Sequence, residues 1–278
     1  MILLSVSCIL PIIHILAISL SDKSAAAAGW VGLWPVHFTT VAYEYIVTKP
    51  EFMTAFFVSI KRLALGIPLN LLMVLITAYP LSKSPRDFKG RSVYMWYFVF
   101  TMLFGGGLIP TYLTISKLKL LDSIWVLILP GLLPVWNMIL MVNFFRGIPK
   151  ALEESAFIDG AGHMVVLWKI YIPLSLPALA TIGLFTAVGH WNAWFDGMLY
   201  MNTPINYPLQ TYIRTVVMGA TADMARMLEG ENWRVMSKLS DKAVKCAQIF
   251  LGALPILCIY PFLQKYFMTG IVLGSVKE

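Results

Sequence analysis

One polar cluster interrupts an apolar stretch of the chain, and its residue types suit the binding of sugars. The cluster consists of His190, Trp191, Asn192, Trp194 and Asp196. Histidine, asparagine and aspartate can form hydrogen bonds with hydroxyl groups, and tryptophan offers a flat apolar face. Sugar rings have the matching properties, because they carry apolar faces and rims of hydroxyl groups. The alternative is that the polar side chains join neighbouring helices while the tryptophans belong to an interfacial aromatic belt.

Two asparagines in an earlier apolar stretch can serve either purpose. Asn137 and Asn143 lie among hydrophobic residues, where a polar group is costly unless it faces a cavity or a partner. We therefore group Asn137 with the cluster above as a candidate substrate pathway.

No arrangement of residues indicates an enzyme. The histidines are His14, His37, His163 and His190. None is paired at the spacing of a metal-binding motif. Gly105–Gly107 is not followed by the Lys-Ser/Thr of a phosphate-binding loop. The three cysteines suggest neither a disulfide framework nor a metal site. We expect no catalytic residue, no metal site and no cofactor bound by this chain.

A second polar segment, Lys150–Pro177, lies between two long apolar stretches. Lys150–Ile158 contains good helix formers, Asp159-Gly160 is a turn signal, and Gly162–Ile172 can form a second short helix limited by two prolines. The apolar face expected for the first helix consists of Ile148, Leu152 and Ala156. The segment therefore predicts two short helices joined by a bend, for which an ordinary connecting loop is the alternative.

The composition excludes an ordinary soluble domain. Of the 278 residues, 59% are hydrophobic and only 13% are charged, whereas a soluble domain is about 25% charged. The mean hydropathy is +0.76. The chain is therefore an integral membrane protein, and we expect residues 1–278 to form a single transmembrane domain. Membrane topology accounts for most of the basic residues behind the net charge of +7, so nucleic acid is not an expected partner.

Six stretches lack acidic and basic residues and are long enough to cross a bilayer, which takes about 20 residues. They are Met1–Ser21, Leu63–Ser82, Ser92–Ser116, Ser123–Phe145, Ile170–Phe195 and Cys246–Gln264. Because unpaired backbone groups are costly in lipid, we expect an all-α protein with six transmembrane helices. The glycines and prolines expected to interrupt spans three, four and six are Gly105–Gly107, Pro110, Pro130, Pro134, Pro255 and Pro261.

The first span has a second interpretation. Ala25–Ala28 can pass for the cleavage region of a signal peptide. The apolar run is too long for that class, and no basic residue precedes it, so we favour a retained helix.

Basic residues in the loops predict the orientation. Loop Lys83–Arg91 holds four basic residues against one acid, and loop Arg146–Lys169 holds three. The positive-inside rule places both loops and both termini in the cytoplasm. The long loop Tyr200–Lys245 is external in this scheme although it carries six basic residues, but long loops weigh less in the rule. Lys61 and Arg62, at the mouth of the second span, are expected to be lipid anchors, with attraction of an anionic substrate as the alternative.

The second polar segment closely resembles the EAA motif of ABC-transporter permease subunits. The matching residues are Glu154-Ser155-Ala156-Phe157-Ile158-Asp159-Gly160-Ala161, then Ile170, Pro173 and Pro177. Ser155 replaces the usual alanine. The similarity covers nearly the whole chain, and further matches to the carbohydrate-uptake branch are Ala78–Ser82, Tyr207–Gln210, Pro261–Phe267, Gly270 and Gly274–Lys277. Within that branch the chain resembles the second permease of the maltose transporter, and most of all permeases for oligosaccharides or polysaccharides such as pectin-fragment and alginate importers.

The resemblance implies a type I ABC importer permease in which residues 146–172 form a cytoplasmic coupling loop. The residues it implies for coupling to an ATPase are Glu154, Ser155, Ala156, Asp159, Gly160, Ala161 and His163. Glu154 would face the ATPase, Gly160 would make the bend, and Ala156 and Ala161 would allow close approach. The C-terminal residues Gly274–Glu278 can also reach toward the ATPases.

The resemblance also implies the partners and the location. They are a second permease subunit in a heterodimer, a dimer of ATP-binding subunits that holds ATP and Mg²⁺, an extracytoplasmic solute-binding protein, a saccharide substrate and the lipid of a bacterial inner membrane. This chain itself would be a non-catalytic transport subunit. In the maltose system the sugar site lies mainly in the other permease.

Three other functions remain as alternatives. One is an ABC permease for a different small solute. A self-contained secondary transporter or channel would need buried ionisable residues that form a relay, and the six apolar stretches contain none. A membrane enzyme would need a catalytic set. Net basicity, with Lys61, Arg62 and His190, favours an anionic saccharide such as a uronate oligomer, and lipid anchoring is the alternative explanation.

Overall fold

The computed structural model describes residues 2–227 and 240–275, and within these ranges it contains helices and no strand. The all-α fold class is therefore confirmed. The chain divides into two compact units, Met1–Ile60 with Asn192–Cys258 and Lys61–Trp191 with Ile259–Glu278. Each unit is described by itself, and the single domain expected from the sequence stays a prediction.

Unit one holds the N-terminal helices and those after Asn192. Its elements are α1 (Ile2–Ser19), α2 (Lys23–Ala28), α3 (Val41–Thr48), the start of α4 (Pro50–Ser82), α12 (Phe195–Tyr200), η4 (Pro204–Asn206), α13 (Leu209–Met227) and the first part of α15 (Asp241–Ser275). Asp22 caps α2 by accepting a hydrogen bond from the Ala25 backbone at 2.8 Å. The buried Ser59 hydroxyl accepts a hydrogen bond from the Leu209 amide at 2.7 Å, which joins α4 to the start of α13.

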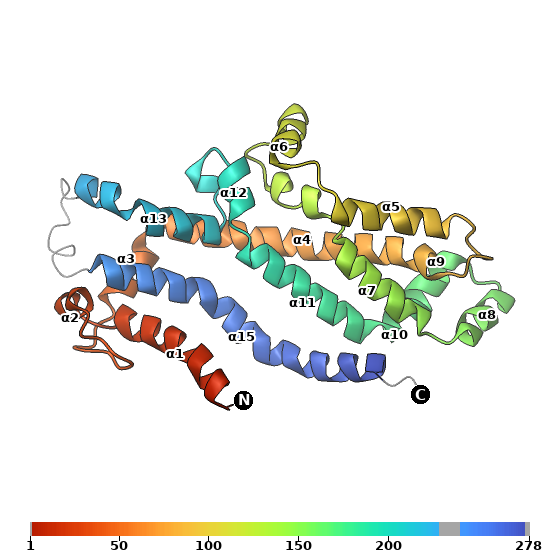
Figure 1. Ribbon diagram of the computed structural model, residues 1–278, viewed down its shortest axis with the longest axis horizontal. Helices are drawn as coiled ribbons and strands as arrows, with labels where there is room; N and C mark the ends of the chain where they lie inside the picture. The colour runs from red at the N-terminus through yellow and green to blue at the C-terminus, as the bar shows by residue number, and fades with distance from the viewer. Residues whose placement is uncertain (1, 228–239, 276–278) are drawn as a thin grey trace. The chain divides into compact units, whose positions relative to one another are not determined.

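Unit two contains the candidate coupling segment (Figure 1). Its elements are the rest of α4, α5 (Arg91–Leu103), α6 (Leu108–Lys117), η1 (Ile124–Leu127), η2 (Leu129–Gly131), α7 (Val135–Arg146), α8 (Lys150–Ile158), α9 (His163–Val166), η3 (Leu167–Tyr171), α10 (Ile172–Leu174) and α11 (Leu176–Asn192). Its core is built from α4, α7, the α9–η3 turn and α11, and its fully buried members include Val74, Met138, Met141, Val166 and Ile182. This core holds the end of α4 against the segment that follows α7.

Three of the predicted spans are bent helix pairs. The bend is 110° between α5 and α6, 49° between η1–η2 and α7, and 82° between α9–α10 and α11. Gly107 has a φ of +88° at the first bend, and Pro130 and Pro134 lie at the second, so the expected interruptions at these residues are confirmed. The expectation is wrong for Pro110, because α6 continues through it. The expectation is wrong for span six, because α15 continues through Pro255 and Pro261. A proline in a membrane helix removes one backbone hydrogen bond, which neighbouring groups can replace.

The number of membrane crossings is only partly established. In the described part of the chain, two helices are long and apolar enough to cross a membrane, and up to five spans result if each bent pair counts as one. The apolar part of α1, Leu4–Ser19, is shorter. Six spans therefore stay a prediction. The second span is longer than predicted, since α4 begins at Pro50 and runs through Lys61 and Arg62.

Candidate functional site

The predicted pair of short helices is present in unit two, and Gly160 makes the bend between them. Gly160 has a φ of +81°, a left-handed conformation that favours glycine. Its amide donates to the Phe157 carbonyl at 3.0 Å, and the Ala161 amide donates to the Ala156 carbonyl at 2.9 Å. These two bonds form a Schellman motif, which ends α8 and turns the chain into α9. The second helix is shorter than predicted, because a π-helical turn, η3, follows α9.

One edge of α8 packs against the core of unit two. Ile148, just before the helix, is buried, and Ala156 and Ala161 pack against the core cluster. The expected apolar face is wrong at Leu152, whose side chain is 42% exposed. The position next to it, Glu153, turns inward instead, although this residue is not among those predicted from the sequence.

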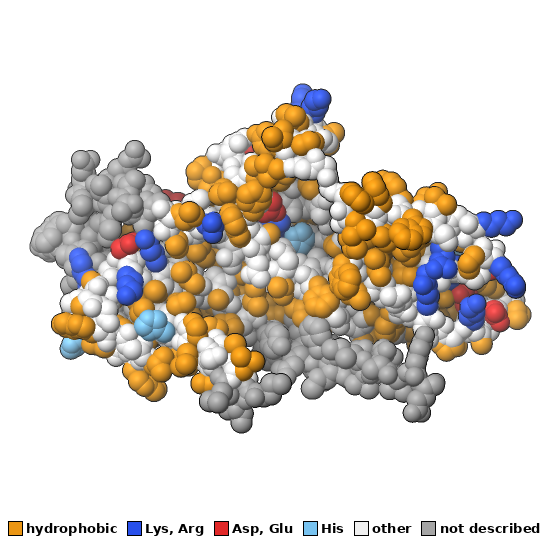
Figure 2. Space-filling model, viewed as in Figure 1, with side chains coloured by type: hydrophobic (Ala, Val, Ile, Leu, Met, Phe, Trp, Pro, Cys, Tyr) orange, Lys and Arg blue, Asp and Glu red, His pale blue; other side chains and the backbone are white. Residues whose placement is uncertain are grey.

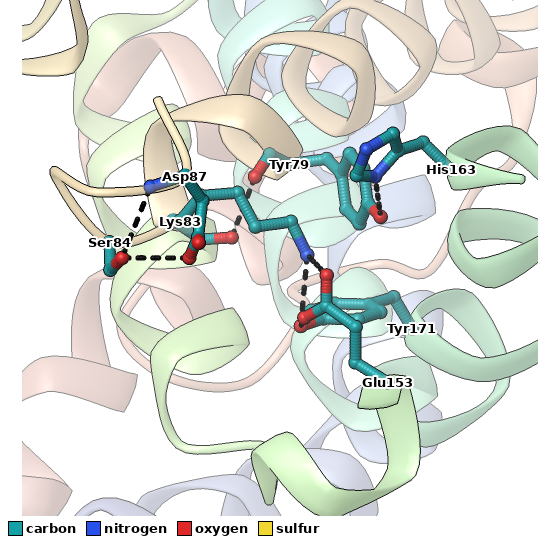
Figure 3. Close-up of polar contacts among 8 residues, drawn as sticks. Tyr79, Lys83, Ser84, Asp87, Glu153, His163 and Tyr171 are labelled. Carbon is teal, nitrogen blue, oxygen red and sulfur yellow. Dashed lines mark hydrogen bonds and ion pairs between the residues drawn. The ribbon is translucent and has the colours of Figure 1, made fainter. Parts of the chain in front are cut away.

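Glu153 is the centre of a polar network under α8 (Figure 3). Its Oε1 lies 2.6 Å from the Nζ of Lys83, just after α4, and its Oε2 accepts a 2.6 Å hydrogen bond from the Tyr171 hydroxyl in η3. Lys83 Nζ also donates to the Tyr171 hydroxyl at 3.2 Å and lies 3.9 Å from the ring centroid of Tyr79. Burial lowers the pKa of Lys83, and the Glu153 carboxylate opposes that shift.

His163, a predicted coupling residue, is attached to α4. Its Nδ1 lies 3.1 Å from the Tyr79 hydroxyl, and its ring packs edge-on against Phe157 with centroids 5.0 Å apart. In the neighbouring loop, the Ser84 hydroxyl donates to Asp87 at 2.7 Å and lowers the pKa of that carboxyl group. His163 is exposed, and its contacts with Tyr79 and Phe157 attach the start of α9 to α4 and α8.

The outer surface of α8 and α9 combines polar and large apolar side chains. The predicted residues Glu154, Ser155, Asp159 and Gly160 are exposed. Exposed apolar residues beside them are Ile158, Met164, Val165 and Trp168, with Ile158 at 86%. We call these eight residues the coupling face. Figure 2 shows basic side chains gathered at the same end of unit two. The apolar members of the coupling face are not among the coupling residues predicted from the sequence. Their positions opposite the inward face of a short helix were a signal that could have indicated an outward-facing surface.

His190, from the predicted pathway cluster, belongs to a second buried network. Arg62 Nε donates to His190 Nδ1 at 3.1 Å, and His190 Nε2 lies 2.8 Å from Asn70 Oδ1. Asn70 Nδ2 donates to the backbone carbonyls of Gly131 and Leu132 at 2.9 and 2.7 Å. Because a guanidinium can only donate, His190 accepts at Nδ1 and carries its hydrogen on Nε2. The network joins α4, α11 and η2.

This network corrects two expectations. Arg62 is 3% exposed and hydrogen-bonded to His190, so it is not a lipid anchor, whereas Lys61 is exposed. The second correction concerns the expected lack of ionisable residues in the spans. Arg62 is an ionisable residue buried in a span helix, because α4 begins before the predicted apolar stretch Leu63–Ser82. A buried arginine is costly unless it is paired, and the His190 contact provides a partner.

The other pathway candidates separate into different surroundings. Asn137 is buried and donates to the Thr186 hydroxyl at 3.4 Å, which joins α7 to α11 as in the helix-packing alternative. Trp191 is buried in unit two. Asn192, Trp194 and Asp196 belong to unit one.

In unit one, the pathway candidates make local contacts. The Arg214 guanidinium lies 3.8 Å from the centroid of the Trp194 ring, so one face of this tryptophan is covered. Asp196 Oδ1 accepts a hydrogen bond from the Gly197 amide at 2.8 Å, at the start of α12, and Asn192 is exposed. A shared saccharide site for these residues stays a prediction. Among the described residues, no three His, Cys, Asp or Glu side chains are grouped to hold a metal.

Comparisons with known proteins agree on one class of membrane protein. Residues 55–219 match the family described as binding-protein-dependent transport system inner membrane component. The polygalacturonan/rhamnogalacturonan transport system permease protein YtcP of Bacillus subtilis is 40% identical over 97% of this chain and 93% of its own length. Protein LplC of the same organism is also 40% identical, over 97% of this chain and 89% of its own length.

A solved structure has the same fold. It is a chain from the crystal structure of a bacterial ABC transporter involved in the import of the acidic polysaccharide alginate. The two chains are 33% identical with a TM-score of 0.87, and the match covers 95% of this chain and 92% of that one.

Proposed function

The chain belongs to the family of binding-protein-dependent transport system inner membrane components, and from this premise we propose that it is a permease subunit of an ABC importer for an acidic saccharide. The observation that carries the proposal is near full-length similarity to two proteins whose names specify acidic polysaccharides, a polygalacturonan/rhamnogalacturonan permease and an alginate importer. Both polymers are rich in uronate rings. The proposed substrate is therefore an oligosaccharide or polysaccharide fragment that carries carboxylates.

The proposed role of the coupling face is to dock on an ATP-binding subunit. Glu154 and Asp159 offer carboxylates, and Ile158 and Trp168 offer apolar area, which together suit a cleft on a protein partner. Ala156 and Ala161 are small where α8 approaches the core, and Gly160 sets the angle between α8 and α9. In this proposal ATP and Mg²⁺ bind only to the partner subunits, and this chain hydrolyses nothing.

The mechanism is alternating access driven by differential binding. ATP favours one state of the ATPase dimer, and the docked helices pass that preference to the pathway because they contact one state better than the other. The complex would contain a second permease subunit, a dimer of ATP-binding subunits and an extracytoplasmic solute-binding protein. It would lie in a bacterial inner membrane with α8 and α9 on the cytoplasmic side.

The decisive experiment uses the transporter assembled with its binding protein in liposomes. We expect ATP hydrolysis to rise when the binding protein carries uronate oligomers and to change little with neutral oligosaccharides of the same length. Ligand stimulation by the neutral oligomers alone would contradict the acidic-saccharide proposal. Transport by this chain with no ATP-binding subunit present would contradict the importer proposal as a whole.

Two variants test the coupling face. Glu154→Ala removes an exposed carboxylate, and Gly160→Pro cannot adopt the left-handed bend. Each should reduce ligand-stimulated ATP hydrolysis about tenfold, equivalent to about 1.4 kcal/mol of coupling, without loss of membrane insertion. Glu51→Ala, another exposed acid at the start of α4, is the matched control and should retain full stimulation. Normal stimulation in both coupling variants would refute the docking role.

A further inference from the structure

Two successive glutamates of α8 have opposite environments. Glu154 is exposed on the coupling face, whereas the side chain of Glu153 is 14% exposed and turns toward the core of unit two. Successive residues of a helix are about 100° apart, so one acid can face a partner while the next faces inward. The inward acid has no place in the docking surface and needs a separate explanation.

Glu153 connects three segments that are far apart in the sequence. Lys83 follows α4, Glu153 lies in the first turn of α8, and Tyr171 ends the π-helical turn η3 (Figure 3). Each pair among the three is joined, at 2.6 Å for Lys83–Glu153, 2.6 Å for Tyr171–Glu153 and 3.2 Å for Lys83–Tyr171. We call this closed triangle of polar contacts the latch.

The aromatic rings around the latch restrict its geometry. The Tyr171 ring packs edge-on against Tyr79 of α4 and Phe145 of α7, with centroids 5.1 Å apart in both cases. Lys83 Nζ lies over the Tyr171 ring at 4.3 Å. A π-helical turn contains an extra residue and so changes the direction of the side chains that follow, and such turns are frequent at functional sites. The Tyr171 ring is therefore held between α4 and α7 while its hydroxyl group donates to Glu153 of α8.

The apolar contacts of α8 are too few to determine that orientation. No residue of α8 is fully buried, and Ala156 is its one member packed against the core cluster. A small side chain permits a helix to roll or slide, whereas the two directed polar contacts that Glu153 makes with Lys83 and Tyr171 do not. A buried ion pair is often no more stabilising than apolar residues of the same size, so geometric specificity is the better explanation for this one.

We propose that the Lys83–Glu153–Tyr171 latch sets the angle of α8 on the end of α4 and on η3, so that the coupling face moves as one body with these transmembrane segments. Glu153 is thus a positioning residue for coupling and does not touch the ATP-binding partner. The inference rests on the proposed function, because it concerns how the docked segment transmits a change of state. It assigns a role to residues outside the coupling face.

The test measures ATP hydrolysed per saccharide transported in the complete transporter. Lys83→Met and Glu153→Gln break the ion pair and should raise this ratio about fivefold, within the usual range of coupling energies, while the ATP-binding subunits stay bound. Tyr171→Phe keeps the ring and should give a smaller rise. Lys83→Arg keeps the charge and should restore most of the wild-type ratio. Lys89→Met removes an exposed lysine from the same loop and is the matched control.

A double variant separates positioning from stability. Lys83→Met with Glu153→Leu leaves no uncompensated buried charge, so the thermal midpoint of the complex should return close to wild type. The latch predicts that the ratio of ATP to saccharide stays high. A wild-type ratio in the double variant, or in both single variants, would overturn the inference and leave the proposed function intact. A wild-type chain that retains no ATP-binding subunit would overturn the proposed function first.

Discussion

Asn70 is the residue through which the buried Arg62–His190 pair reaches the backbone of η2. It is fully buried and donates to the carbonyls of Gly131 and Leu132. Asn70→Leu leaves these carbonyls and the His190 Nε2–H without their partner, at about 1–3 kcal/mol for each unsatisfied group. We therefore expect a clearly lower thermal midpoint, measured by tryptophan fluorescence in detergent.

The control for this change is Asn143→Leu on the exposed side of α7. It removes the same amide from a residue that is not buried, so the midpoint should hardly change. Equal midpoints for Asn70→Leu and wild type would show that the network does not stabilise the fold.

Gly160 offers a second test at the scale of one residue. A side chain at this position meets no neighbouring atom, but the φ of +81° disfavours any Cβ. Gly160→Ala should cost about 1 kcal/mol, and amide exchange of Asp159 and Ala161 should quicken about fivefold. Asparagine tolerates this conformation better, so Gly160→Asn should have a smaller effect.

Gly162→Ala is the matched control, because this glycine also has open space and its φ is −82°. Exchange should stay at the wild-type rate. If Gly160→Ala behaved like Gly162→Ala, the left-handed bend would not exist in solution.

At the scale of elements, α4 and α11 approach each other closely where Gly66 faces His190. A Cβ on Gly66 would lie 2.7 Å from His190 Nε2, whereas a Cβ on Gly183 of α11 would meet Leu71 at an ordinary 3.7 Å. Gly66→Ala should therefore displace His190 from Asn70 and lower the thermal midpoint. Gly183→Ala should be neutral or slightly stabilising, since alanine is the better helix former by about 1 kcal/mol.

This prediction is tested by comparing the thermal midpoints of Gly66→Ala and Gly183→Ala with that of the wild type. A loss of similar size in both variants would mean that helix packing, and not the His190 contact, requires the glycines.

The elements near α8 show what a sequence can and cannot reveal. Helix formers followed by Asp159-Gly160 led to two helices and a bend, because turn chemistry is local. The inward direction of Glu153 was missed, since it depends on Lys83 and Tyr171, which are distant in the sequence. Spacing also placed Leu152 on the inner face, but a helix of nine residues is oriented by its tertiary contacts.

Charge counting misled in a similar way at α4. The charges of Lys61 and Arg62 predict the border of an apolar span, but the helix continues through both. The free energy of a buried arginine depends on its partner, and His190 lies 128 positions away along the chain. In contrast, Gly105–Gly107 marks a helix break correctly, because backbone flexibility acts at the residue itself.

For the whole molecule, the exposed apolar surface is as informative as the buried core. Figure 2 shows hydrophobic side chains over α5, where Val93, Trp96, Tyr97 and Phe100 are exposed. Exposed apolar side chains gathered in this way fit contact with lipid or with another membrane subunit. The polar latch, the coupling face and this surface therefore divide unit two into parts with different surroundings.

The orientation of the whole chain in the membrane is a prediction that labelling can test. The charge rule places α8 in the cytoplasm and the connection between α2 and α3 outside. Ile158 is 86% exposed and Trp34 is 83% exposed, so a cysteine at either position will be accessible from its own side. Cys8, Cys246 and Cys258 are first replaced by alanine. In whole cells that express this chain without the ATP-binding subunit, which would cover Ile158, a membrane-impermeant maleimide should then label Trp34→Cys directly and Ile158→Cys only after permeabilisation. The opposite pattern would place α8 outside, where no cytoplasmic ATP-binding subunit can reach it, and the proposed coupling role would fail with it.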